Sequence, residues 1–293
     1  RIFVAQAKKI LKAHNPLVVV VVGSVGKTGT KLAIAKVLQQ KYRVRYQEGN
    51  YNVPLTLSFV LTGQQLPTLT NPFGWFMALV HIQKYIYGNF PYDVVLLELG
   101  TDAPGDIIAF KDIVKADIAV VSAISEEHME YFHNLEAVAE EELSVAHFAQ
   151  KLIINKDDCN TDFIDLFVPN NIPVINYGFT KRAHYAIQAK RNTHHSFDMM
   201  VTTPSKSAIH SHVSVAAEYG LKAVAAAIAV ADVLQLTHKQ IEKGVAAITP
   251  NAGRMRIFEG LNNTIIIDDS YNSSPLAAEA ALHSLYGMQA PER

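Results

Sequence analysis

Short unbroken apolar runs alternate along this chain with longer segments in which apolar residues recur at helical spacing. The runs are rich in β-branched residues and are bounded by glycine or polar positions, which is typical of strands buried on both faces of a parallel sheet. They comprise residues 17–22, 94–99, 118–123, 152–155 and 174–177. We therefore expect five neighbouring strands that share one buried sheet.

Helical patterns separate several of these runs, and they comprise residues 28–40, 105–114, 135–148 and an alanine-rich stretch at 219–234. This alternation predicts an α/β fold with a doubly wound, mostly parallel sheet. Residues 180–215 break the rhythm with short alternating pieces rich in His, Thr and Ser, so we expect a small antiparallel excursion there. A new strand is expected at 264–267. Ligands of such sheets bind beyond the carboxyl ends of the strands.

The segment between the first apolar run and the first helix has the composition of a phosphate-binding loop. Glycines let backbone N–H groups approach a polyphosphate, and the helix N-terminus adds positive dipole. Val21 stands where the strict pattern has glycine, so this is a shorter variant, and the alternative is a chance Gly-Lys-Thr turn. We expect this loop to bind ATP, with the lysine on the β/γ-phosphates and the threonine hydroxyl on Mg²⁺. The residues expected to bind are Gly23, Ser24, Val25, Gly26, Lys27, Thr28 and Gly29.

Several titratable residues follow the next strands. Glu98 ends the 94–99 run among apolar neighbours, where a carboxylate suits Mg²⁺; the alternative is a cap on a neighbouring helix. His128 follows the 118–123 run, but imidazole suits softer metals, so its chemistry alone favours a surface or packed histidine. The acidic residues 140–142 on their own indicate a solvated helix face, or charges that complement a helix N-terminus.

Composition narrows the possible function. The chain is 49% hydrophobic and 18% charged, which is globular, and its net charge of -1 gives no sign of a nucleic-acid partner. A single cysteine, Cys159, excludes a disulfide framework or a cysteine-based zinc site within one chain, and fits the cytoplasm, where we expect the protein to act. No uncharged apolar run approaches the roughly 20 residues of a membrane helix, and no cleavable leader is visible.

The order of motifs resembles that of the Mur ligases. The motifs are GSVGKT at 23–28, GNYNVPLT at 49–56, YDVVLLELG followed by GDI at 92–107, the histidine segment, NAGRM at 251–255 and DDSYNSSP at 268–275. The resemblance covers nearly the whole chain and is greatest to the MurF-type branch, which adds D-alanyl-D-alanine to a UDP-muramoyl tripeptide. It implies activation of a carboxylate as an acyl phosphate by ATP, with two Mg²⁺ ions, followed by attack of an amine.

The resemblance also implies a domain organisation. Mur ligases have an N-terminal UDP-substrate domain, a central ATPase domain and a C-terminal Rossmann-like domain. We therefore expect a linker helix from a missing N-terminal domain at 1–16, the central ATP-binding domain at 17–249, and the truncated start of the C-terminal domain at 250–293. The expected partners are a UDP-linked muramoyl peptide or similar carboxylate donor and an amino acid or dipeptide acceptor.

Carried over by position, the resemblance assigns roles to individual residues. Thr28 and Glu98 would hold the first Mg²⁺, and Glu98 with His128 the second. Lys27 and Arg254 would contact the phosphates, Arg254 on the γ-phosphate side. Two further positions match motifs beside the substrates: Asn50 would lie near the reacting acyl group, and Asp269 and Asn272 would form the hinge motif beside the nucleotide.

The chain departs from the family at two places. Most members have a lysine, carbamylated by CO₂, that bridges the second metal, and Glu142 occupies that position here. A glutamate already supplies a carboxylate, so we expect it to replace the carbamate, with altered metal spacing because the side chain is shorter. The asparagine pair near adenine is replaced by Tyr219 and Lys222. Tyr219 could stack on a base, so base preference stays open.

Residues 71–90 form an apolar, aromatic segment beyond the usual MurF-type pattern. His81, Gln83 and Lys84 interrupt it, so we expect a packed amphipathic helix, with a peripheral membrane contact or a protein partner surface as the alternative. Together with the altered lysine position, this segment keeps two other functions open. These are a related Mur-fold ligase, of the folylpolyglutamate synthase or MurT kind, and an ATP-binding module that has lost ligation.

Overall fold

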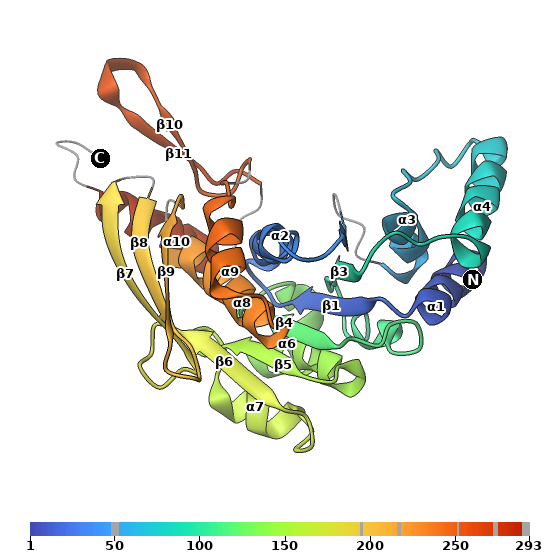
Figure 1. Cartoon of the computed structure of the whole chain (residues 1–293), viewed down its shortest axis with the longest axis horizontal. Coiled ribbons are helices and arrows are strands. Elements are labelled where there is room, and N and C mark those ends of the chain that lie inside the picture. Colours follow the sequence, from blue (N-terminus) through green and yellow to red (C-terminus); the bar gives the residue numbers. More distant parts are fainter. Residues whose placement is uncertain (48–52, 194–195, 216–217, 251, 272–274, 289–293) are drawn as a thin grey trace.

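The computed structural model of the chain describes residues 1–47, 53–193, 196–215, 218–250, 252–271 and 275–288. A nine-stranded sheet runs through the molecule in the order β2-β3-β1-β4-β5-β6-β7-β8-β9 (Figure 1). Strands β1 to β7 pair in parallel wherever they are neighbours, and β8 and β9 are antiparallel. The strands are β1 Leu17–Val22, β2 Val44–Tyr46, β3 Val94–Glu98, β4 Ile118–Val121, β5 Leu152–Asn155, β6 Val174–Gly178, β7 Tyr185–Thr193, β8 Ser196–Thr202 and β9 Ala208–Val213.

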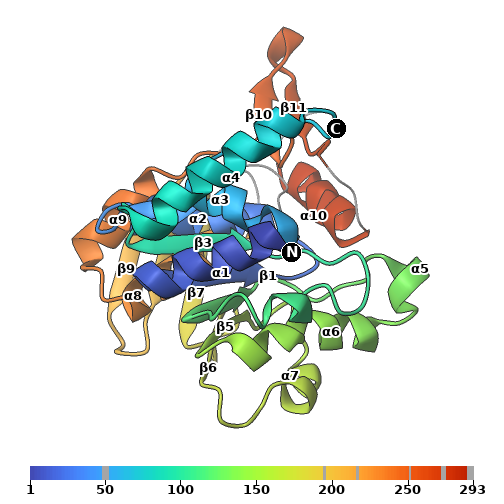
Figure 2. The ribbon, with the colours of Figure 1, turned by 90° about the vertical axis from the view of Figure 1, so that its right-hand side faces the viewer.

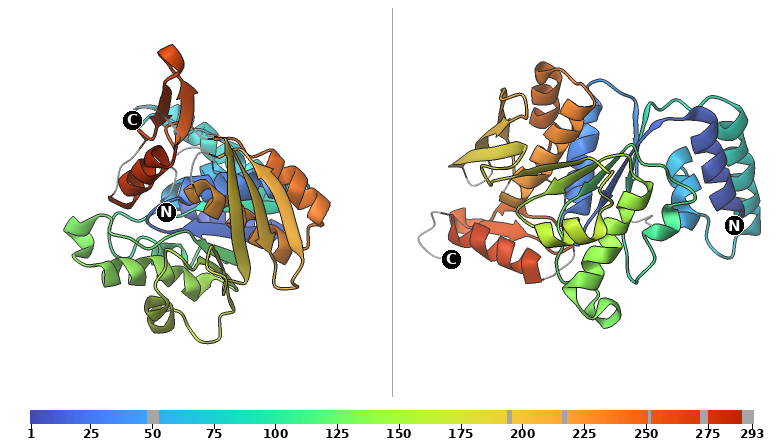
Figure 3. Two further views of the ribbon diagram at one scale, coloured as in Figure 1. Left: turned by 90° about the vertical axis from the view of Figure 1, so that its left-hand side faces the viewer. Right: turned by 90° about the horizontal axis from the view of Figure 1, so that it is seen from below.

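Helices cover both faces of this sheet (Figures 1 and 3). Alternate residues of a strand point to opposite faces, and β1 shows the result. Val18, Val20 and Val22 lie in one core cluster, and Val19 and Val21 lie in the other. The first cluster lies under α1 Ile2–His14, α3 Leu57–Thr62, α4 Pro72–Tyr87 and α6 Leu135–Leu143, and the second under α2 Lys27–Leu38, α8 Glu218–Val233 and α9 His238–Ala246.

The predicted strands and most of the predicted helices are confirmed. The antiparallel excursion is formed by β7, β8 and β9, and the alanine-rich stretch is α8. Small alanine side chains let α8 pack closely on α2 and the sheet. The pattern analysis missed β2, α9 and the short helices α3, α5 Met129–Phe132 and α7 Thr161–Phe167.

The helix predicted at 105–114 is wrong. The structure has turns there, with a single 3-10 turn at Ile108–Phe110. Both carboxylate oxygens of Glu141 accept backbone N–H groups from this segment, from Gly105 and from Ile107, each at 2.7 Å. Glu141 is itself buried on α6. A tertiary contact therefore takes up the N–H groups of this segment, which local spacing cannot reveal.

The last part of the chain leaves the main sheet. The expected strand near 264–267 is β11 Ile265–Asp268, and it pairs antiparallel with β10 Arg256–Glu259 in a separate two-stranded sheet. Helix α10 Pro275–Tyr286 follows. At the other terminus α1 packs on α3 and α4 and contributes Ala7, Ile10 and Leu11 to the core. The domain limits set by the family resemblance stay a prediction.

Candidate functional site

The phosphate-type loop connects β1 to α2 at the carboxyl end of β1, as the sequence predicted. Two glycines permit its path. Gly23 has φ 124° and a Cβ there would lie 2.5 Å from Ser122 Oγ, while Gly26 has φ 86° and a Cβ would lie 2.6 Å from the Tyr219 hydroxyl. Ser24 Oγ accepts the N–H of Ser125 at 3.0 Å, which ties the loop to the segment after β4. The loop is therefore held from several sides.

The first charged group at the loop surrounds Glu98, at the end of β3. Thr28, in the first turn of α2, donates its hydroxyl to Glu98 Oε1 at 3.0 Å. Lys31, one turn further along α2, places Nζ 2.9 Å from Glu98 Oε2, in an ion pair without the alignment of a hydrogen bond. The Lys31 side chain is only 2% exposed. Glu98 is thus a carboxylate neutralised by a buried cation.

The second charged group surrounds Glu142, near the end of α6. Glu142 Oε2 accepts the N–H of Gly23 at 2.7 Å, so α6 reaches the phosphate loop directly. Glu127 lies beside it, and Glu127 Oε2 is 3.8 Å from Lys27 Nζ. Lys27 also donates to the Gly23 carbonyl. One loop lysine therefore faces two carboxyl groups.

Burial sets the protonation of this second group. Glu142 is 0% exposed, and its pKa is raised well above the usual range, first because burial disfavours the charged form and also because Glu127 lies against it. Lys27 and the Gly23 N–H oppose this shift in pKa. The Oε1 atoms of Glu127 and Glu142 are buried without a hydrogen-bond partner. Such a carboxyl pair either shares a proton or receives a cation.

The residues proposed as metal ligands are thus brought to the loop in part. Thr28 and Glu98 are in contact, whereas the contacts of Glu142 are with Gly23 and Glu127. His128 is more exposed than Glu98 and Glu142, and its backbone φ is 47°. Its Nε2 atom lies 3.5 Å from Asp102 Oδ1. In the described part of the chain, no group of three His, Cys, Asp or Glu residues has the arrangement of a metal site. The four-residue metal set therefore stays a prediction.

Arg254 reaches the loop from the far end of the sequence. Its guanidinium donates to Thr28 Oγ1 at 3.1 Å and lies 4.0 Å from the centre of the Tyr271 ring. Asp269 Oδ1 accepts the N–H of Met255 at 3.0 Å, which fixes the turn that carries Arg254. Burial raises the pKa of Asp269. A cation held over the phosphate loop by an aromatic ring is suited to an anionic ligand.

The two positions that depart from the family motif near adenine lie on the other side of the loop. Tyr219 packs against Gly26, and its buried hydroxyl has no hydrogen-bond partner. Lys222 donates to both carboxylate oxygens of Asp158, at 2.8 and 2.7 Å. Asn155 also donates to Asp158, at 2.6 Å. Lys222 is therefore an ion-pair partner in this structure, while Tyr219 contacts the loop itself.

Two expected site residues, Asn50 and Asn272, lie outside the described residues. Three charged residues of this region were not predicted from the sequence. They are Lys31, Glu127 and Asp158. The spacing of Lys31 gives a signal, because it follows Lys27 by four residues and so shares its helix face. Glu127 and Asp158 have no comparable signal, since contacts between residues far apart in sequence place Glu127 beside Lys27 and Asp158 beside Lys222.

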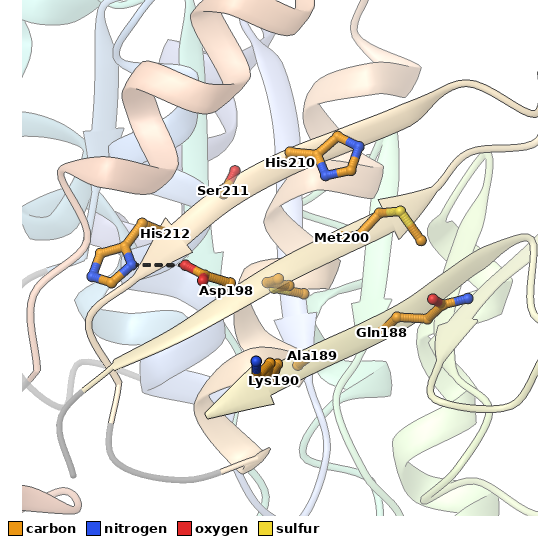
Figure 4. A pocket seen from close by; sticks show the side chains of 9 residues that line it. Gln188, Ala189, Lys190, Asp198, Met200, His210, Ser211 and His212 are labelled. Atoms are coloured by element: carbon orange, nitrogen blue, oxygen red, sulfur yellow. Dashed lines mark hydrogen bonds and ion pairs between the residues drawn. The ribbon is translucent and has the colours of Figure 1, made fainter. Parts of the chain in front are cut away.

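A separate hollow of about 590 Å³ lies on the outer face of β7, β8 and β9 (Figure 4). Opposite strand positions bring Lys190, Asp198 and His212 into one row there. His212 Nδ1 lies 3.0 Å from Asp198 Oδ1, and all three residues are exposed. The buried residues of the same strands lie instead in the core cluster with α8 and α9. This hollow is therefore part of the open sheet surface and does not include the phosphate loop.

A parallel α/β sheet with a glycine loop, a loop lysine and a hydroxyl at the helix start defines the chain as a phosphate-loop protein. Within that class, the chain belongs to the Mur ligase family, because residues 21–231 match the Mur ligase middle domain. This confirms the family resemblance of the motifs and the predicted fold class.

The chain is similar to UDP-N-acetylmuramoyl-tripeptide–D-alanyl-D-alanine ligases. It is 24% identical to that of Bacillus subtilis over 288 residues, covering 94% of this chain and 54% of the relative. It is 25% identical to that of Rickettsia prowazekii over 274 residues, covering 91% and 55%. The chain thus spans about half the length of these relatives.

Solved structures share the fold. MurF from Acinetobacter baumannii superposes with a TM-score of 0.78 at 19% identity, covering 97% of this chain and 57% of that one. MurF from Thermotoga maritima, in complex with ADP, gives 0.73 at 20% identity, covering 97% and 60%. The apo form of L. casei FPGS gives 0.68 at 16% identity, covering 97% and 75%. At these identities the likeness concerns the fold alone.

Proposed function

We propose that the chain is the ATP-binding portion of a Mur-type amide ligase, which activates a carboxylate and joins it to an amino acid or dipeptide. The observation that carries this proposal is the meeting of Lys27, Thr28, Glu98 and Arg254 at one phosphate loop, with Arg254 supplied from 226 residues away. A chance Gly-Lys-Thr turn would not recruit a guanidinium from the last segment of the chain.

ATP would lie with its phosphates over the loop. The free N–H groups at the start of α2 and the helix dipole favour negative charge there. Lys27 would leave the Gly23 carbonyl and Glu127 to bind the β/γ-phosphates, and Arg254 would add a second cation on the γ-phosphate side. Tyr219 packs on Gly26, so it would border the nucleotide and could stack on its base.

The donor set at the loop fits Mg²⁺. Thr28 Oγ1 and Glu98 Oε1 are oxygen ligands 3.0 Å apart, so they would hold a first ion beside the phosphates. The unpartnered buried Oε1 atoms of Glu127 and Glu142 would serve a second ion, with His128 as a further candidate. When bound, Mg²⁺ would neutralise charge on the phosphates and so reduce their repulsion of the incoming carboxylate.

The reaction we propose proceeds in two steps. A carboxylate oxygen of the donor attacks the γ-phosphorus, and the bond from the γ-phosphorus to the bridging oxygen of the β-phosphate breaks. ADP departs, and the donor then carries the phosphoryl group as an acyl phosphate. The acceptor amine then attacks the acyl carbon through a tetrahedral intermediate, which expels inorganic phosphate and loses a proton to form the amide. Lys27 and Arg254 would stabilise the phosphoryl group during its transfer.

The substrates follow from the similar proteins. Their names specify UDP-N-acetylmuramoyl-tripeptide and D-alanyl-D-alanine, so we propose a UDP-linked muramoyl peptide as donor and an amino acid or dipeptide as acceptor. Synthesis of cell-wall peptidoglycan precursors would then be the process served. Since such a ligase consumes ATP, we expect it to work in the cytoplasm.

Calorimetric titration of the chain with Mg·ATP tests the nucleotide site. We expect Lys27→Ala to weaken binding at least about tenfold, the loss of one charge-assisted contact to phosphate. Lys36→Ala is the matched control, since Lys36 is an exposed lysine of the same helix, and it should bind as the unchanged chain does. Equal affinity in all three proteins would overturn the phosphate-loop assignment.

A second function has support from one observation. The FPGS structures, one with AMPPCP and folate, share the fold and are covered over about three quarters of their length. Release of phosphate by the complete protein, measured with a muramoyl tripeptide or a folate plus its acceptor, separates the two ligases. Mg·ATP binding without phosphate release from any donor would instead indicate a module that has lost ligation.

A further inference from the structure

Positive charge is concentrated in the first third of this nearly neutral chain. Residues 1–92 contain eleven Lys or Arg residues and a single acidic residue, Glu48, although the whole chain has 26 basic and 27 acidic residues. None of α1, α3 and α4 contains an Asp or Glu. These three helices pack together at one end of the molecule (Figure 1). Of the eleven basic residues, Lys8, Lys9, Lys12 and Lys84 lie on these helices, which have no acidic residue of their own.

The outer side of α1 carries part of this charge. Lys8, Lys9 and Lys12 are exposed on one stripe of the helix, while Ala7 and Ile10 on the opposite side are buried in the core. Helix α1 lies against α4 (Figure 2). The three lysines thus lie on the exposed side of a helix that packs against α4.

Helix α4 presents apolar side chains on its outer side. Its exposed large apolar residues follow the i, i+3, i+4, i+7 spacing of one helix face, with Phe73 70% and Phe76 59% exposed. Met77 and Val80 continue the stripe, and Lys84 and Tyr87 complete it. Unlike the inner side of the helix, this stripe contributes nothing to the core.

The inner side of α4 is firmly seated. Ala78, Ile82 and Ile86 are buried, and the helix packs on α1 and α3. Trp75 packs on Phe3 and Phe59, at 5.5 and 5.8 Å between ring centres, and its indole N–H donates to the Thr68 carbonyl at 3.0 Å. The outer aromatic residues therefore lie on the side of α4 that faces away from this packing.

We propose that this α1–α4 face, formed by Lys8, Lys9 and Lys12 of α1 and by Phe73, Phe76, Met77, Val80, Lys84 and Tyr87 of α4, binds the surface of a bilayer that contains anionic lipids. Aromatic and aliphatic side chains enter the boundary between headgroups and acyl chains, and lysines attract anionic headgroups. Among the described residues, no helix has both the length and the apolar character to cross a bilayer. The proposal does not depend on the ligase reaction.

Vesicle co-sedimentation of the chain tests this proposal. We expect binding to vesicles of phosphatidylcholine with one third phosphatidylglycerol, and at least about tenfold weaker binding to phosphatidylcholine alone, because each lysine near an anionic surface contributes about fivefold. Lys8→Glu/Lys9→Glu should remove most of that preference. Phe76→Ser should weaken binding about tenfold, in line with withdrawal of one large apolar side chain from the boundary.

Matched variants elsewhere on the surface serve as controls. Lys239→Glu/Lys243→Glu on α9 reverses two exposed lysines, and Leu166→Ser on α7 removes an exposed apolar residue; both should bind vesicles as the unchanged chain does.

Two results would overturn the proposal. They are absence of vesicle binding, and binding that the control variants lose as much as the α1–α4 variants. A dimer that Phe76→Ser dissociates, in a chain that ignores vesicles, would show that the face joins two copies instead.

Discussion

The carboxylates at the phosphate loop form two groups, one around Glu98 and one around Glu142, which differ in how their negative charge is neutralised. Glu98 at the end of β3 has a buried cation, Lys31, at 2.9 Å, and a hydroxyl donor in Thr28. Glu142 on α6 has another carboxyl group, that of Glu127, beside it, and the nearest cation, Lys27, is 3.8 Å from Glu127. The first group is balanced within the chain, whereas the second has more carboxyl groups than cations.

This difference indicates where added charge is needed. A cation placed between Glu127 and Glu142 would relieve their repulsion and the burial penalty together. Binding of ATP would also draw Lys27 from this pair to the phosphates, which leaves the carboxyl groups with still less compensation. The comparison therefore favours metal binding on the Glu142 side once nucleotide is present, in addition to the ion proposed beside Glu98.

Removal of the buried cation on the Glu98 side should have the largest effect. We expect Lys31→Met to lower the free energy of unfolding by about 3 kcal/mol at neutral pH, because it leaves Glu98 largely buried without its ion-pair partner. The double variant Lys31→Met/Glu98→Gln should recover most of that loss. Urea unfolding measures both. If the double variant is no more stable than Lys31→Met, then the pair is not the source of the effect.

Loss of the charge on Glu98 itself should affect metal-dependent binding. Glu98→Gln keeps an oxygen near Thr28 but removes the carboxylate, so we expect Mg·ATP to bind about ten- to a hundredfold more weakly. ATP without Mg²⁺ should bind no worse than it does to the unchanged chain, since one negative charge has gone. Calorimetry with and without Mg²⁺ separates the two, and an equal loss in both would contradict a metal role.

In the second carboxylate group, Glu142→Gln should raise the free energy of unfolding relative to the unchanged chain. This gain should grow with pH to about 1 kcal/mol, which is typical of a single substitution. The raised pKa of Glu142 means that its stability contribution is full below the unfolded pKa and is lost as pH rises toward the folded pKa. Glutamine does not ionise, so the advantage should be absent near pH 4 and present at pH 8. Glu140→Gln, on the exposed side of the same helix, should show no such trend. A constant difference across pH would count against the buried neutral carboxyl group.

An exposed ion pair gives the smallest effect and a reference for both groups. Arg43 donates to Asp93 from its guanidinium and its backbone, and these hydrogen bonds lower the pKa of Asp93 to about 2. Asp93→Asn should cost no more than about 1 kcal/mol at pH 7, because the pair is solvated. The cost should persist above the ordinary Asp pKa and disappear as pH falls through 2. If Asp93→Asn lowers the free energy of unfolding as much as Lys31→Met does, then burial does not explain the strength of the Lys31–Glu98 pair.

Much of the fold could be predicted from the sequence, because strands buried on both faces are continuous apolar runs. The loop residues Gly23–Thr28 and the placement of Glu98 and Arg254 could be predicted as well. The environment of Glu142 could not, since Gly23 and Glu127 reach it only through the order of strands β1 and β4 and the packing of α6. The failed helix at 105–114 has the same cause, because the buried carboxylate of Glu141 determines that backbone.

The most direct test of this account is the number of Mn²⁺ ions, used in place of Mg²⁺, that bind with a non-hydrolysable ATP analogue in buffer freed of CO₂, counted by electron paramagnetic resonance. The account predicts two ions for the unchanged chain, one for Glu142→Gln, and two for Glu140→Gln, because the built-in carboxylate of Glu142 needs no carbamylation. One ion in the unchanged chain, or two that Glu142→Gln retains, would contradict the account.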